Sequence, residues 1–221
     1  MRSKLLTMFG GKAAPVLVTD GMWAWWPLLA DWNDAYSTNN LTAAASTADP
    51  VIGASGGEFD GNDRATIADA PDYSSGISFC CYVNPTSLGL VHNVAWSVSD
   101  GGALKGSLGI KNDGAIISYN GGIAATSTET SFSGETGNWH TIGMSSVDNE
   151  TNTVLYFDGL ALTSTGIAHP NGTLDGSTLG SRLYGSASFS LTGIIRNAVV
   201  YEKALSAAEQ LQNHQYFLVN P

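Results

Sequence analysis

Short segments of alternating apolar and polar residues, each closed by a turn-forming residue, recur along most of this sequence. Residues 77–85, ISFCCYVNP, alternate in this way and end at Pro85. Successive side chains of a β-strand point to opposite faces, and a proline cannot donate a hydrogen bond to a neighbouring strand. The triplet Asn112-Asp113-Gly114 separates two further segments and is a hairpin signal. The pattern predicts an all-β chain of short antiparallel strands.

The composition supports this fold class and excludes some partners. The 221 residues include 26 glycines and 43% hydrophobic residues, which is enough for one β-sandwich core. The net charge of −10 has the wrong sign for neutralising nucleic-acid phosphates, so no nucleic-acid partner is expected. No stretch approaches the roughly eighteen apolar residues that a membrane helix needs, so no membrane partner is expected either.

The chain divides into an arm and one domain. Residues 1–20 contain glycines and Pro15, which suit an extended segment, and their apolar stretch is too interrupted for a signal peptide. Residues 21–221 are expected to form the domain, with one short C-terminal helix where Ser206 and Glu209 form a capping box.

Adjacent Cys80 and Cys81 point to opposite faces of a strand, so they are not expected to form a disulfide. Further strands are expected over 22–29, 91–99, 107–110, 115–119, 138–146, 153–159 and 193–201, and a long exposed loop over 126–137.

Three carboxylates lie close together in residues 57–67, GEFDGNDRATI. Retaining glycoside hydrolases use two carboxyl groups about 5 Å apart, and a hydrolase hypothesis would assign these roles to Glu58 and Asp63. However, Gly61-Asn62 interrupts the segment, and such residues favour a turn between two strands. Turn formation is therefore the preferred interpretation of these acids.

Several fragments, in this order, resemble the laminin G-type domains of the concanavalin A-like lectin and glucanase superfamily. Their order and spacing are more specific than any single fragment. The resemblance implies a two-sheet antiparallel jelly-roll sandwich, and it also implies that F-D-G-x-D is a structural turn. The fragments are WWPLLADWNDAYSTNN (25–40), GGEFDGNDRATI (56–67), CCYVNP (80–85), GNWHTIGM (137–144), VLYFDG (154–159) and LTGIIRNAVVYEKALSAAEQ (191–210).

The resemblance also implies candidate ligands. Many domains of this type bind calcium through carboxylates and loop carbonyls, although no cofactor is required and Arg196 stands where the family often has an acid. Glycan binding would use exposed aromatic side chains stacked on sugar rings. The possible calcium ligands are Asp31, Asp34, Asp60 and Asp63, and the possible glycan-binding residues are Trp23, Trp25, Trp96 and Tyr119.

Two functional hypotheses follow for such a domain. The first is a non-enzymatic structural or adhesion module on the surface of a phage virion, made in the host cytoplasm and attached to other virion proteins through the arm. It would be a homo-oligomer, and its loops would face host glycans. The second is a stand-alone, calcium-dependent lectin. The virion hypothesis is an analogy of fold and biosynthesis.

Overall fold

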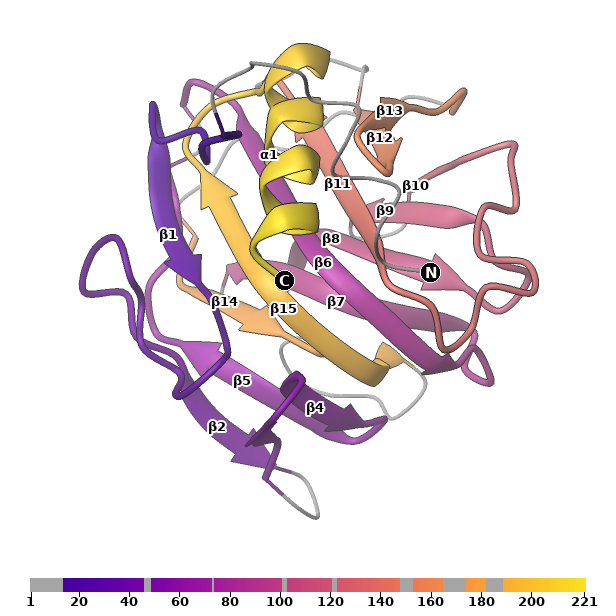
Figure 1. Ribbon diagram of the computed structural model, residues 1–221, viewed down its shortest axis with the longest axis horizontal. Helices are drawn as coiled ribbons and strands as arrows, with labels where there is room; N and C mark the ends of the chain where they lie inside the picture. The colour runs from indigo at the N-terminus through magenta and orange to yellow at the C-terminus, as the bar shows by residue number, and fades with distance from the viewer. Residues whose placement is uncertain are drawn as a thin grey trace.

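The chain folds into two β-sheets that pack face to face (Figure 1). The computed structural model describes residues 14–45, 49–72, 74–100, 103–120, 123–147, 153–164, 174–181 and 189–221. In these ranges all strand pairs are antiparallel, and one helix lies on the outer face of the first sheet. The predicted all-β jelly-roll sandwich with a short C-terminal helix is confirmed. No helix in the described ranges is both long enough and apolar enough to cross a bilayer.

The strand order defines the two sheets. In the first sheet it is β13-β12-β11-β6-β15-β4-β3, with β1 also paired to β15, and in the second it is β10-β9-β8-β7-β14-β5-β2. The first sheet contains β1 (Met22–Trp26), β3 (Val51–Gly53), β4 (Gly56–Asp60), β6 (Ile77–Ser87), β11 (His140–Ser146), β12 (Val154–Phe157), β13 (Leu160–Ala161) and β15 (Thr192–Tyr201). The second contains β2 (Thr42–Ala45), β5 (Asp63–Ile67), β7 (His92–Asp100), β8 (Ala103–Lys111), β9 (Ile116–Asn120), β10 (Ile123–Thr126) and β14 (Gly176–Leu179).

Strand β15 organises the first sheet. On one flank it pairs with β6, and on the other it pairs first with β4, at Thr192–Ile195, and then with β1, at Ala198–Tyr201. The register shifts between Arg196 and Val199, and Asn197 has a φ of +53° at this irregularity. The Asn197 N–H donates to the Pro27 carbonyl, at 3.3 Å. This contact fixes where the chain leaves β1.

The main hydrophobic core lies between the sheets. Phe79 of the first sheet stacks on Trp96 of the second, with ring centroids 5.0 Å apart and planes at 6°. Phe132 is also fully buried, so the polar segment 126–137 is anchored to the core by one aromatic side chain and is not the wholly exposed loop that its composition predicts. The predicted turn at Gly61-Asn62 is present, and it carries the chain from β4 in one sheet to β5 in the other.

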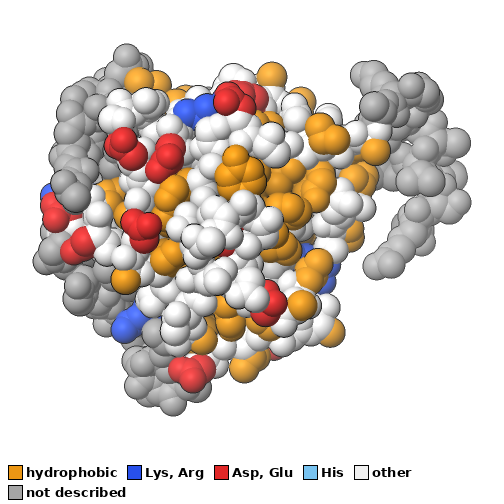
Figure 2. Space-filling model, turned by 90° about the vertical axis from the view of Figure 1, so that its left-hand side faces the viewer, with side chains coloured by type: hydrophobic (Ala, Val, Ile, Leu, Met, Phe, Trp, Pro, Cys, Tyr) orange, Lys and Arg blue, Asp and Glu red, His pale blue; other side chains and the backbone are white. Residues whose placement is uncertain are grey.

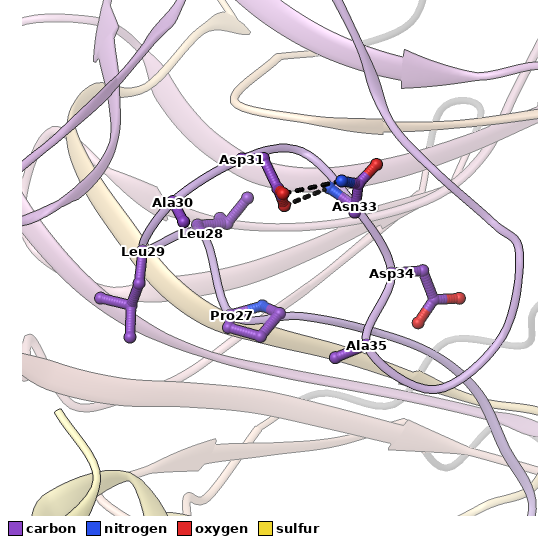
Figure 3. A pocket seen from close by; sticks show the side chains of 8 residues that line it. All are labelled: Pro27, Leu28, Leu29, Ala30, Asp31, Asn33, Asp34 and Ala35. Atoms are coloured by element: carbon purple, nitrogen blue, oxygen red, sulfur yellow. Dashed lines mark hydrogen bonds between the residues drawn. The ribbon is translucent and has the colours of Figure 1, made fainter.

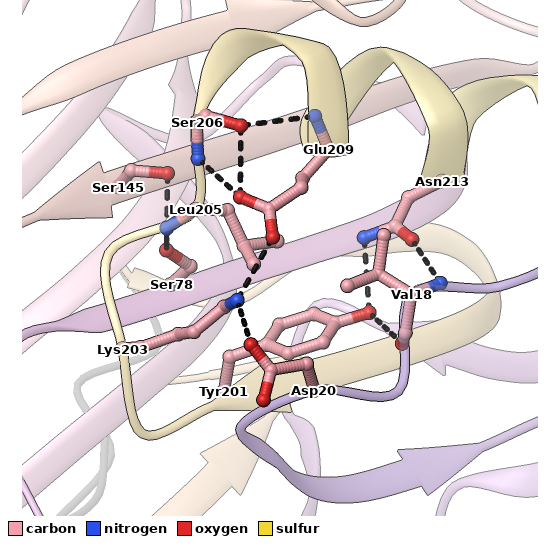
Figure 4. Close-up of polar contacts among 10 residues, drawn as sticks. All are labelled: Val18, Asp20, Ser78, Ser145, Tyr201, Lys203, Leu205, Ser206, Glu209 and Asn213. Carbon is pink, nitrogen blue, oxygen red and sulfur yellow. Dashed lines mark hydrogen bonds and ion pairs between the residues drawn. The ribbon is translucent and has the colours of Figure 1, made fainter.

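A second hydrophobic cluster lies under the helix, α1 (Ala207–Val219). Ser206 and Glu209 form the predicted capping box, and α1 crosses β6 and β11 (Figure 1). Leu17 and Val18 of the predicted arm are buried in this cluster. The Val18 N–H donates to the Asn213 side chain, as Figure 4 shows. Residues 14–20 therefore pack on the domain itself, and residues 1–13 lie outside the described ranges.

Candidate functional site

The loop that follows β1 lines a surface pocket of about 170 Å³ (Figure 3). Pro27 ends the strand because it has no N–H to offer. Leu28 then turns the chain with a φ of +57°, a conformation that costs a non-glycine residue about 1 kcal/mol or more and persists only where packing enforces it. The Leu28 side chain is fully buried, which supplies that packing. The pocket is lined by Pro27, Leu28, Leu29, Ala30, Asp31, Asn33, Asp34 and Ala35.

Asp34 holds the second half of this loop against β1. Its Oδ1 accepts the backbone N–H groups of Trp25 and Tyr36, at 2.9 and 2.8 Å. Its Oδ2 accepts the N–H of Asn39, at 3.2 Å, and the hydroxyl of Ser37. A carboxylate offers about four lone-pair sites, so these four donors occupy it fully. A calcium ion on Asp34 would have to compete with these hydrogen bonds, and Asp34 as a calcium ligand stays a prediction.

Asp31 lies at the rim of the pocket. Its two oxygens accept the backbone N–H and the side-chain N–H of Asn33, at 2.9 and 2.7 Å. Figure 3 shows that the Asp31 carboxylate points toward Asn33, whereas the Asp34 carboxylate turns away from it. The structure therefore does not bring these two predicted ligands together. Across the ranges described above, no three His, Cys, Asp or Glu side chains are grouped so that they could hold a metal ion.

Hydrophobic side chains gather on the side of the molecule that carries β1 and this loop (Figure 2). Leu29 and Tyr36 of the loop are about half exposed, at 48% and 50%. Trp23 and Trp25 of β1, both predicted glycan-binding residues, are half-buried. Trp25 donates its indole N–H to Asn197 and packs edge-on to Tyr216. The surroundings of the pocket are therefore rich in aromatic and aliphatic surface.

The other two predicted glycan-binding residues lie elsewhere. Trp96 has no exposed surface, and its indole N–H donates to the Ser177 hydroxyl at 2.9 Å. Its prediction is wrong, because a tryptophan within the core has no free face for a sugar ring. Tyr119 is half-buried on β9 of the second sheet, beside His92. Of the four residues, Trp23 and Trp25 meet the loop after β1 through their backbones, since the Trp25 N–H donates to Asp34 and the Trp23 carbonyl accepts from Ser37.

Asp60 and Asp63 flank the turn between β4 and β5. The Asp63 Oδ2 accepts the Asp60 N–H at 3.1 Å, while its Oδ1 is buried without a hydrogen-bond partner among the described residues. Burial raises the pKa of Asp63, and the nearby charges of Asp60 and Asp49 add to this rise. The unpartnered oxygen is the group that a cation would satisfy, and calcium binding by Asp60 and Asp63 stays a prediction.

The carboxylates of the hydrolase hypothesis do not form a pair. Glu58 is exposed on β4 of the first sheet, and its carboxyl group lies against Gly53, where a Cβ atom would meet the Glu58 Oε1 at 1.8 Å. Asp63 is only 4% exposed at the start of β5 in the second sheet. The two acids therefore stand on different sheets, one in solvent and one buried.

A cluster of titratable groups that the sequence did not predict lies at the edge of the first sheet. The His140 Nδ1 is 2.9 Å from Asp158 Oδ2, and the His140 Nε2 is 3.5 Å from Glu135 Oε2. His214 of α1 lies 3.9 Å from the Asp158 Oδ1. The hydrogen bond to Asp158 raises the pKa of His140, whereas burial lowers the pKa of His214. For Asp158, burial raises the pKa, but hydrogen bonds from His140 and the Thr141 N–H outweigh burial and leave it lowered.

These shifts predict a pH dependence of stability. Because the pKa of His140 is higher in the folded state than in the unfolded state, protonated His140 stabilises the fold. This stabilisation is fully present below the unfolded-state pKa of about 6.5 and is lost as pH rises through the folded-state pKa. His214 has the opposite sign, since its lowered pKa makes the folded state resist protonation. We expect His140→Gln to lower the free energy of unfolding more at pH 5.5 than at pH 8.5.

Urea denaturation at the two pH values measures this difference, with His214→Gln as the matched variant. His214→Gln should lower the free energy of unfolding less at pH 5.5 than at pH 8.5. Equal costs of His140→Gln at both pH values would show that the ion pair with Asp158 adds nothing to folding.

The fold and this loop define a two-sheet jelly-roll domain with a surface pocket beside its edge strand. A family model described as the concanavalin A-like lectin/glucanases superfamily matches residues 59–209. The match covers more than half of the chain, and the chain belongs to this superfamily. No curated protein sequence matches it.

Solved structures with a similar fold come from several proteins. A Trypanosoma rangeli sialidase in complex with 2,3-difluorosialic acid has a TM-score of 0.73 and 15% identity, over 93% of this chain and 34% of the sialidase. Domain 4 of AbnA, a GH43 extracellular arabinanase from Geobacillus stearothermophilus, in complex with arabinotriose, has a TM-score of 0.67 and 18% identity, over 87% of this chain and 98% of that domain. The binding domain of Paraclostridial Mosquitocidal Protein 1 has a TM-score of 0.65 and 15% identity, over 88% of this chain and 52% of that one.

These neighbours correct one prediction from the sequence. The expectation of a non-enzymatic module is contradicted, because the similar structures include sialidases and a domain of an arabinanase. The chain spans about a third of the length of the sialidases. At 15–18% identity, the likeness itself shows the fold.

Proposed function

We propose that this domain binds carbohydrate at the pocket in the loop after β1. The observation that supports this most directly is the combination of apolar walls and a polar rim in one small pocket. Ligand sites in proteins are mostly apolar with a few placed polar groups, which is the composition of this loop. The structural neighbour from the arabinanase is named as a complex with arabinotriose, so this fold is compatible with glycan binding.

The chemistry of a sugar ring matches the two parts of the pocket. A sugar has an apolar C–H face, which can lie on Pro27, Leu29 and Ala35, and it has hydroxyl groups that both donate and accept hydrogen bonds. At the rim, Asp31 supplies an acceptor and Asn33 supplies an amide with donor and acceptor atoms. Trp23 and Trp25 belong to β1, the strand that leads into this loop, and are half-buried, so their exposed ring surface could stack on a further sugar.

Filling the pocket should abolish this binding. Ala30 is exposed and lines the pocket, so an indole introduced by Ala30→Trp would occupy the space of a sugar ring. We expect the wild-type protein to bind a defined set of glycans on an array, and Ala30→Trp to bind them at least about tenfold more weakly, a loss of about 1.4 kcal/mol. The array is read in calcium and again in chelator, which also tests the calcium dependence predicted from the sequence.

Ala68→Trp is the matched control, since Ala68 is an exposed alanine outside the pocket, after β5. This variant should bind glycans as the wild type does. Unchanged binding by Ala30→Trp would move the glycan site away from this loop. A wild-type array that is blank in both buffers would refute carbohydrate binding itself.

A further inference from the structure

The charge of the pocket indicates which class of glycan it accepts. Its eight lining residues include two carboxylates, Asp31 and Asp34, and no Lys, Arg or His. The Asp31 carboxylate is exposed at the rim, where it meets any ligand that enters. Three lysines of the described chain are already held in ion pairs away from the lining: Lys105 with Asp100, Lys111 with Asp113, and Lys203 with Asp20 and Glu209.

An acidic sugar would be poorly matched to such a pocket. Proteins bind a carboxylate or sulfate through charge-assisted hydrogen bonds, most effectively from the planar fork of arginine. Here the first charged group that an anionic ligand meets is another carboxylate, and like charges at contact repel. The net charge of −10 adds a repulsive field for anions at longer range.

Neutral hydroxyl groups suit the same atoms. Each Asp31 oxygen accepts one hydrogen bond from Asn33 and keeps lone pairs that can accept from a sugar O–H. A carboxylate acceptor forms stronger hydrogen bonds with hydroxyl groups than a neutral acceptor does. The hydrogen bonds from Asn33 also hold the Asp31 carboxylate in one orientation, so less side-chain entropy is lost when a ligand binds.

The size of the pocket limits the length of sugar chain that it holds. Its volume of about 170 Å³ lies below the roughly 300–1,000 Å³ of pockets that bury a drug-sized ligand. All of its lining residues come from one stretch, 27–35, and none comes from a neighbouring element. A groove for the interior of a polysaccharide would extend over several elements, whereas this pocket is sized for a single ring.

We propose that the pocket binds the terminal residue of a neutral glycan and discriminates against sialic and uronic acids, with Asp31 as the residue that sets this specificity. This inference rests on the proposed function. It also separates the domain from the sialidases that share its fold, whose named ligands are sialic acid and its analogues.

Paired glycans test this specificity. The full-length protein is titrated with neutral oligosaccharides and with the same oligosaccharides extended by a terminal sialic or uronic acid. We expect the neutral member of a bound pair to have at least about tenfold higher affinity, or about 1.4 kcal/mol. Asp31→Asn should weaken binding of the neutral glycan several-fold. It should also reduce the ratio of the affinity for the neutral glycan to the affinity for its acidic counterpart.

Asp72→Asn is the control for this substitution. Asp72 is an exposed aspartate that accepts the backbone N–H and the hydroxyl of Ser74, much as Asp31 accepts two N–H groups of Asn33. It is not among the pocket-lining residues, and its variant should leave both affinities unchanged. Equal or tighter binding of the acidic members, or an Asp31→Asn protein that behaves like Asp72→Asn, would overturn the neutral-glycan proposal while leaving carbohydrate binding intact. If the wild-type protein bound no glycan at all, both the carbohydrate-binding proposal and the neutral-glycan proposal would be refuted.

Discussion

Asp34→Ala is expected to destabilise the domain by about 3–4 kcal/mol. Asp34 is 9% exposed, and its carboxylate accepts three backbone N–H groups and one hydroxyl. These hydrogen bonds are only part-buried, so each donor left without a partner costs toward the lower end of the roughly 1–3 kcal/mol of a buried group. For a chain of this length the midpoint of thermal unfolding should fall by about 6–16 °C.

Asp34→Asn separates the two halves of this effect. The amide oxygen can still accept the N–H groups of Trp25 and Tyr36, whereas the amide nitrogen cannot accept from Asn39 or Ser37. We therefore expect about half the loss, measured by urea denaturation at pH 7. If Asp34→Ala lost less than about 1 kcal/mol, the loop would owe its shape to packing of Leu28 and not to the carboxylate.

Features that depend on neighbouring residues could be predicted from the sequence. Ser206 and Glu209 cap α1 through atoms three residues apart, and Gly61-Asn62 makes its turn within the local chain. Strand positions were predicted from alternation, but their ends were not: β6 continues through Pro85 to Ser87 and is buried on both faces at Ile77–Val83, and β8 covers Ala103–Lys111 where only 107–110 was expected. Such patterns carry their own physical cause, because side-chain period and turn geometry are local properties.

The role of each tryptophan could not be predicted in the same way. Trp25 and Trp96 both lie on strands with apolar neighbours, and alternation alone does not show which face the second sheet or α1 covers. The pairing of Trp25 with Val199 turns its side chain to the outer face, while Trp96 meets Phe79 between the sheets. Side-chain exposure was therefore decided by long-range strand register, which a single sequence does not reveal.

The His140 cluster was missed for a similar reason. His140 and Asp158 are 18 positions apart and meet only because β11 and β12 pair in register, with Ile142 opposite Phe157. His214 joins them from α1, a further 56 positions along the chain. The virion location, its partner proteins and the homo-oligomeric state stay predictions that rest on the analogy of fold and biosynthesis.

Asn213→Leu is expected to cost about 2–4 kcal/mol and to release residues 14–20 from the domain. The Asn213 amide is fully buried on α1, accepts the Val18 N–H at 3.0 Å and donates to the Tyr201 hydroxyl at 3.0 Å. The Tyr201 hydroxyl in turn donates to the Val18 carbonyl, also at 3.0 Å, so the three residues close a ring of hydrogen bonds (Figure 4). Leucine has a similar shape but leaves the buried Val18 N–H without an acceptor.

The segment that this ring holds determines how attachment through the N-terminus must be tested. Tyr201→Phe removes one member of the ring while keeping the aromatic packing, so it should lower the free energy of unfolding by about 1–2 kcal/mol. The double variant should lower it by less than the sum of the two single variants, because the two side chains share partners.

Limited proteolysis within residues 14–20 should accelerate in Asn213→Leu, and unchanged cleavage would mean that burial of Leu17 and Val18 alone holds the segment. Because residues 14–20 contribute to folding, a deletion that tests binding to a partner should end at residue 13; a longer deletion would lower binding through instability and would imitate the loss of a contact.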